Sequence, residues 1–150
     1  METRFYTGVP VKSLKPKLYS FWKGWIARYT SRGLTVVSRE VGARKVVVEG
    51  GAVKYELTPQ KRIDIRIAFD MRTCAAEGKY DVVLLFSQDD DFAEAALEIA
   101  KIGRQLGKEI VVVSAFPTSG RRWLGVTGTR WIRISKEEYD GCLDQRERGA

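Results

Sequence analysis

The stretch VVLLFSQDDDF, residues 82–92, carries an apolar run directly into three consecutive aspartates. The run Val82–Phe86 has the length and the apolar composition of a buried strand. Three carboxylates at the end of such a strand repel one another, and burying them unpaired is costly. A divalent cation removes that cost, because clustered hard oxygen ligands are what Mg²⁺ or Mn²⁺ needs. The stretch therefore predicts a strand whose end binds a metal ion.

The acidic stretch opens a strand–helix–strand pattern. A helical pattern runs from about residue 91 to 106, and a second apolar run comes after it at Ile110–Val113. Two apolar strands joined by an amphipathic helix are typical of a right-handed βαβ unit in a parallel sheet, where ligands bind beyond the carboxyl ends of the strands. The helix is expected to bury Phe92, Ala95, Ala96, Ile99, Ile102 and Leu106.

The rest of the chain extends this pattern to a single α/β domain over residues 1–144. Its predicted architecture is a mainly parallel sheet flanked by helices. A β-hairpin at residues 45–57 is indicated by Gly50-Gly51 between two apolar runs. Other expected features are a helix over 13–31 with Ser13 as its cap and an aromatic buried face, a helix over 61–77, a final helix opened by a capping box at Ser135, and a frayed tail at 145–150.

Composition limits the function classes. The chain has 26 Lys and Arg against 19 Asp and Glu, a net charge of +7, which favours a polyanion such as nucleic acid as partner; a plain solvated basic surface is the alternative. The absence of histidine excludes Ser-His triads and His-ligated zinc. No segment has transmembrane length and residues 1–4 do not open a signal peptide, so the prediction is a cytoplasmic protein with no membrane partner.

Five motifs resemble the NYN branch of the PIN-like nucleases, and the LabA-like proteins in particular. Their order and spacing along most of the chain make the resemblance specific, whereas any one of them alone is weak. The motifs are Tyr6–Pro10, Lys61–Asp70, Gly78–Asp81, Ser87–Phe92 and Leu106–Lys108.

The resemblance implies metal-dependent cleavage of RNA on a Rossmann-like fold with three layers. The acidic stretch indicates Mg²⁺ or Mn²⁺ as cofactor. The net charge of +7 and the basic loop at 117–122 favour single-stranded RNA as partner. The resemblance also implies that Asp64, Asp89 and Asp91 are the catalytic, metal-binding carboxylates. Lys61, Arg62, Arg121 and Arg122 are candidates for RNA phosphates. Three further residues are expected to lie around the metal ligands without binding the ion directly: Asp70, Ser87 and Asp90.

Each of these three residues is set apart from the metal ligands for a different reason. Asp70 lies six residues after Asp64, about 240° around a helix, so both cannot face one ion directly. Ser87 is suited to hold the turn through backbone amides. Asp90 replaces a small residue of the family pattern and is interpreted as a solvated neighbour, with an added ligand as the alternative.

The chain departs from the family at two points. The family begins with a central strand that carries an Asp, and this sequence starts at the equivalent of the second strand. Three interpretations are open: the start is truncated, a partner chain or second copy supplies the strand, or catalysis is lost and binding is kept. The family's later Ala-Asp motif is also missing, with Thr129-Arg130 in its approximate place.

Three functions are therefore compatible with the sequence. The main hypothesis is a metal-dependent ribonuclease. The second is a catalytically impaired RNA-binding or scaffold protein on the same fold. The third is another α/β enzyme with an acidic turn, such as a phosphohydrolase, although Phe92-Ala93 after the acids match the phosphatase pattern poorly.

Overall fold

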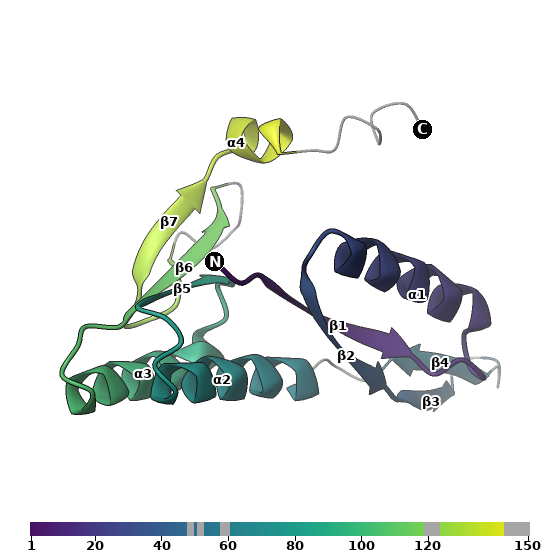
Figure 1. Cartoon of the computed structure of the whole chain (residues 1–150). Coiled ribbons are helices and arrows are strands. Elements are labelled where there is room, and N and C mark those ends of the chain that lie inside the picture. The colour runs from purple at the N-terminus through teal and green to yellow at the C-terminus, as the bar shows by residue number, and fades with distance from the viewer. Residues whose placement is uncertain (48–49, 51–52, 58–60, 119–123, 143–150) are drawn as a thin grey trace. The chain divides into compact units, whose positions relative to one another are not determined.

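The computed structural model describes residues 1–47, 50, 53–57, 61–118 and 124–142. The chain forms two compact units, residues 1–67 and 68–150 (Figure 1). The expected tail at 145–150 lies outside the described residues.

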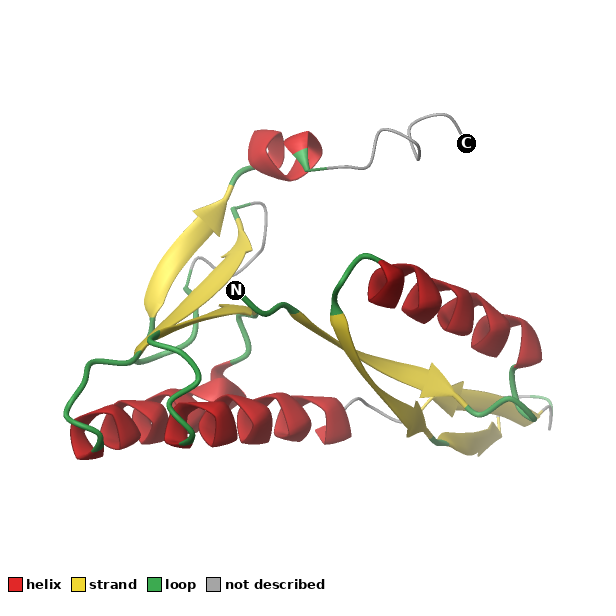
Figure 2. Cartoon of the chain, in the orientation of Figure 1, coloured by secondary structure: helices red, strands yellow, loops and turns green. Residues whose placement is uncertain are grey.

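The first unit opens with a parallel βαβ arrangement made of β1 (Arg4–Pro10), α1 (Pro16–Ser31) and β2 (Thr35–Val41). β1 and β2 pair in parallel along their whole length, and α1 packs against both strands (Figure 2). Gly8 lies inside β1, where a β-carbon would be only 2.6 Å from Cγ1 of Val41 in β2. Glycine therefore permits the close approach of the two strands.

The start of α1 differs from the prediction. The helix begins at Pro16, and the residue before it, Lys15, makes no capping hydrogen bond with its side chain. Ser13 is therefore not the cap. Proline is favoured in the first helical turn because its φ is already helical and it lacks only an N–H that would go unpaired there.

The aromatic stripe of α1 packs only in part. The Tyr29 ring meets the Phe5 ring of β1 edge-on, with 4.9 Å between the ring centroids, and its centroid lies 5.2 Å from that of Trp25. This end of the stripe therefore lies against the sheet. Phe21, at the other end, is 54% exposed, and α1 contains no fully buried residue. The predicted buried face is thus half-buried.

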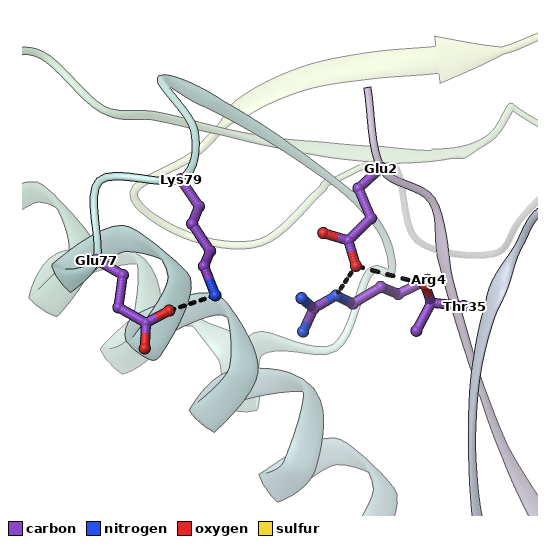
Figure 3. Close-up of polar contacts among 5 residues, drawn as sticks. All are labelled: Glu2, Arg4, Thr35, Glu77 and Lys79. Carbon is purple, nitrogen blue, oxygen red and sulfur yellow. Dashed lines mark hydrogen bonds and ion pairs between the residues drawn. The ribbon is translucent and has the colours of Figure 1, made fainter.

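Polar side chains join the beginnings of the two parallel strands. The Glu2 carboxylate accepts hydrogen bonds from Arg4 Nε at 2.7 Å and from Thr35 Oγ1 at 3.5 Å (Figure 3).

In the second unit, Lys79 Nζ pairs with Glu77 Oε2 at 2.6 Å (Figure 3). Exposed pairs of this kind contribute about 0–1 kcal/mol each.

A β-hairpin comes after β2, as predicted. β3 (Ala43–Val47) and β4 (Val53–Leu57) pair antiparallel, with Val47 opposite Val53. Gly50 lies between them with φ of +93°, a conformation that favours glycine.

The second unit contains a three-stranded parallel sheet with the order β5-β6-β7. The boundary between the units falls inside α2 (Lys61–Ala76). The other elements are β5 (Val82–Phe86), the 3₁₀ turn η1 (Asp90–Phe92), α3 (Ala93–Gln105), β6 (Val111–Pro117), β7 (Arg130–Ile134) and α4 (Lys136–Gly141).

The core of this unit lies between α3 and the central strand β6. Four of the residues predicted to be buried on the helix are at most 6% exposed, namely Phe92, Ala96, Ile99 and Ile102. Leu106 is 48% exposed, so its predicted burial is wrong, and Ala95 is only half-buried. The helix ends at Gln105, and Leu106 is the residue that caps it. The burial predicted for the strand at 82–86 is also wrong, since Val82, Leu84 and Phe86 are 60%, 47% and 71% exposed. The capping box between Ser135 and Glu138 at the start of α4 is confirmed.

These features confirm the α/β class, with parallel sheets flanked by helices and a hairpin at the predicted place. β1-β2 and β5-β6-β7 are separate sheets, and no ladder joins them among the described strands. Within the described part of the chain, no helix has the length and apolar character needed to cross a bilayer.

Candidate functional site: the acidic turn after β5

The acidic turn, residues 87–91, is held by its own side chains. The Ser87 hydroxyl accepts a hydrogen bond from the Asp89 amide at 3.0 Å, which confirms the turn-holding contact predicted for Ser87. Asp89 then caps η1, because its Oδ1 accepts from the Asp91 amide at 3.1 Å. The turn therefore has a defined shape before any ligand is considered.

The three residues of η1 point in three directions, because a 3₁₀ helix has about three residues per turn. Asp90 reaches across the chain, and its Oδ1 accepts a hydrogen bond from the Thr127 amide at 2.8 Å. Phe92 enters the core and is 3% exposed. Asp91 is exposed, and its carboxylate makes no hydrogen bond or ion pair within the described residues.

Asp90 contacts the loop between β6 and β7. The described residues 124–129 of this loop are called the 124–129 loop. Gln88 also reaches this loop, since its Nε2 donates a hydrogen bond to the Leu124 carbonyl at 3.3 Å. Two side chains of the acidic turn thus bind backbone groups of one loop. The turn and the loop are fastened to each other.

Ser114 of β6 fixes the same loop from within the core. Its hydroxyl is fully buried and accepts a hydrogen bond from the Val126 amide at 3.1 Å. Thr129 Oγ1 lies 3.0 Å from Ser114 Oγ and 2.8 Å from the Val126 carbonyl. Since a carbonyl has no proton, Thr129 donates to it and the Ser114 hydroxyl donates to Thr129. The three residues close a ring of hydrogen bonds in which every buried group is satisfied.

Gly125 allows this ring to form. It is buried, and a β-carbon built on it would lie 2.3 Å from Ser114 Oγ. The same atom would lie 2.7 Å from ring atoms of both Phe116 and Trp131. Any side chain at position 125 would therefore push the loop away from β6. No local sequence pattern marks Gly125 or Ser114, because Ser114 meets Val126 and Thr129 across 12 and 15 residues.

The start of β5 is anchored separately. Lys108 Nζ donates to Asp81 Oδ1 at 2.7 Å and to the Tyr80 carbonyl at 3.2 Å. The Tyr80 hydroxyl donates to the Met71 carbonyl of α2 at 2.6 Å. Burial, and to a lesser extent the neighbouring Cys74, raises the pKa of the Tyr80 phenol well above its ordinary value. The phenol therefore remains protonated and keeps α2 attached to the strand.

The family model of the NYN domain matches residues 22–122, which is most of the chain and includes the acidic turn. The chain belongs to the NYN domain family. No curated protein and no solved structure shows significant similarity to it.

NYN domains belong to a nuclease-like superfamily whose members generally act on RNA and use divalent metals. The match identifies the domain and no particular branch, so the LabA-like assignment stays a prediction. The boundaries 1–144 stay a prediction as well.

The residues predicted for the site lie in different places in this NYN domain. Asp64 is in the first turn of α2 and belongs to the first unit, whereas Asp70 belongs to the second unit. Both are half-buried. The side chains of Lys61 and Arg62, and all of Arg121 and Arg122, lie outside the described part of the structure.

The carboxylates of the turn have the chemistry of a metal site, but the described residues do not complete one. In the ranges that the structure covers, no three Cys, Asp or Glu side chains form a group able to hold a metal ion. Two carboxylates of the turn, those of Asp89 and Asp91, are exposed and have no cationic partner among the described residues. Hard oxygen ligands of this kind suit Mg²⁺ or Mn²⁺. The convergence of Asp64 with them stays a prediction.

Proposed function

We propose that this NYN domain is a metal-dependent ribonuclease that hydrolyses phosphodiester bonds of single-stranded RNA. Asp89, Asp91 and Asp64 would hold Mg²⁺ or Mn²⁺. The observation that carries the proposal is the pair of exposed carboxylates of Asp89 and Asp91, on a preformed turn at the carboxyl end of a parallel strand. Substrates of parallel α/β sheets bind at that end.

The residues of the turn divide the work. Asp89 is both cap and ligand, because one of its oxygens binds the Asp91 amide and the other makes no hydrogen bond with described residues. Asp91 is oriented by that same bond. A divalent ion held by Asp89 and Asp91 would supply the positive charge that polarises a scissile phosphate and lowers the pKa of a bound water. No histidine is needed for this chemistry.

The first prediction is that Mn²⁺ raises the melting temperature of the wild-type protein and supports cleavage of a single-stranded oligoribonucleotide, with EDTA abolishing both. A ligand that binds only the folded state stabilises it. The double variant Asp89→Asn, Asp91→Asn should lose both responses. Thermal shift and gel-resolved cleavage are measured on the same preparations.

The matched control is Glu98→Gln, which removes an exposed carboxylate of α3 that pairs with Lys101. Both responses should survive in this variant. If Mn²⁺ shifts the melting temperature of the double variant as much as that of the wild type, the metal binds elsewhere. If Mn²⁺ raises the melting temperature of the wild type and not of the double variant, while the wild type cleaves no RNA, the proposed metal site is supported and the proposed nuclease activity is wrong.

The second prediction concerns the RNA. Because the net charge is +7, affinity for single-stranded RNA should fall steeply as salt rises. Replacing Arg121 and Arg122 with alanine should lower the magnitude of the log–log salt slope by about 1.4, if each arginine neutralises one phosphate. Fluorescence anisotropy over a salt series measures this slope.

The control for this prediction removes two positive charges from α3, Lys101→Ala with Arg104→Ala. An equal loss of slope in both double variants would show that net charge matters and that Arg121 and Arg122 have no particular role. Binding that does not respond to salt at all would show that phosphate contacts do not contribute to affinity.

A second candidate function is a catalytically impaired RNA-binding or scaffold protein. The hydrogen-bond ring favours it, because the family places an acid near position 129 and this chain has a threonine there. The Thr129 hydroxyl is committed to Val126 and Ser114, so this position supplies no carboxylate. RNA binding by the wild type without cleavage in Mg²⁺ or Mn²⁺ would support this function.

A further inference from the structure

Asp90 is the one aspartate of the turn for which a bond to a distant segment is seen among the described residues. Its carboxylate oxygen accepts a hydrogen bond of 2.8 Å from the Thr127 amide, 37 residues further along the chain. The bond ties η1 to the loop that Ser114 already fixes through the neighbouring amide, that of Val126. The carboxylate therefore joins the turn to a loop that is itself bonded to the core through Val126 and Ser114.

The geometry of η1 separates Asp90 from the proposed ligands. Adjacent side chains on a 3₁₀ turn diverge by about 120°. With Phe92 in the core and Asp90 bonded to Thr127, the third direction is the one taken by Asp91. Rotation of η1 about its axis would move Asp91 together with Asp90. The contact that fixes Asp90 thus fixes the direction of Asp91.

We propose that Asp90 is a positioning residue: through the Thr127 amide it sets the orientation of Asp91 and is not itself a metal ligand. This inference rests on the proposed metal-dependent function. Asp90 contributes an acceptor oxygen, which asparagine also has, whereas a ligand or an electrostatic role would require the negative charge. The two roles can therefore be separated by substitution.

The experiment compares Asp90→Ala with Asp90→Asn. Asp90→Ala removes the acceptor, so we expect hydrogen exchange at the Thr127 amide to accelerate about tenfold. RNA cleavage with Mn²⁺ should fall roughly 10- to 100-fold, because small misplacements of reacting groups have effects of this size. Asp90→Asn retains an acceptor and should recover most of both losses.

The outcomes are distinct. If Asp90→Asn is as impaired in cleavage and Mn²⁺ affinity as Asp90→Ala, the charge matters and the positioning role is wrong. If Asp90→Ala leaves Thr127 exchange and cleavage unchanged, Asp90 is an inert surface residue and the proposal is also wrong. If the wild type does not cleave RNA, the Mn²⁺ affinity of the two variants, measured by electron paramagnetic resonance of free Mn²⁺, decides the positioning role separately.

Discussion

Replacing Gly125 with alanine is expected to lower the free energy of unfolding by about 2–4 kcal/mol. The new methyl group would lie 2.3 Å from Ser114 Oγ and 2.7 Å from ring atoms of Phe116 and Trp131. Because these neighbours belong to β6 and β7, the loop must move rather than the strands. Its movement would break the bond between Val126 and Ser114 and leave a buried hydroxyl short of a partner. Urea denaturation monitored by circular dichroism measures the change.

Gly24→Ala is the matched control. Gly24 lies in the middle of α1, and a β-carbon there has no neighbour within 4 Å. Alanine is the better helix former, so this variant should be more stable than the wild type by about 0.5–1 kcal/mol. If Gly125→Ala unfolds at the urea concentration of the wild type, the close packing of the 124–129 loop against β6 is wrong.

Ile99→Ala is expected to lower the free energy of unfolding by about 2–5 kcal/mol. Ile99 is 0% exposed on the face of α3 that packs against β6. Truncating it removes three carbon atoms from a filled core and leaves a cavity that its neighbours fill only in part. The urea midpoint should fall, with little change in the slope of the transition.

Leu97→Ala tests the same helix at an exposed position. Leu97 is 50% exposed, so the loss of an equal number of carbon atoms should cost less than about 1 kcal/mol. Because both substitutions introduce alanine into α3, the difference between their losses in free energy of unfolding reports mainly on burial. Equal losses in both variants would contradict the assignment of Ile99 to the core and of Leu97 to the surface.

The local parts of this fold were predictable from the sequence. The acidic turn comes after β5 where the apolar run ends, the hairpin surrounds Gly50, and Ser135 opens α4, because each of these depends on residues within a few positions of one another. Leu106 and Ser13 were predicted wrongly for a related reason. Periodicity and cap preference locate a helix, whereas its exact ends at Pro16 and Gln105 depend on the path that the chain takes outside the helix.

The contacts that shape the candidate site could not be predicted in this way. Asp90 meets Thr127, and Ser114 meets Val126, across 37 and 12 residues. In the sequence Asp90 is one of three identical neighbours. The family pattern sets it apart from Asp89 and Asp91, but nothing in the sequence indicates that it binds the 124–129 loop. The side chains of Asp90 and Asp91 point in different directions only because η1 is a 3₁₀ turn, with about three residues per turn.

The bond between Asp90 and Thr127 has a consequence for how this site varies in evolution. Position 127 contributes its backbone amide and not its side chain, and the residue is exposed. Natural selection acting on this contact would therefore accept almost any residue at 127 and reject proline, which has no amide hydrogen. A position that looks variable in relatives can in this way be under strict constraint, and that constraint would be visible only as a missing residue type.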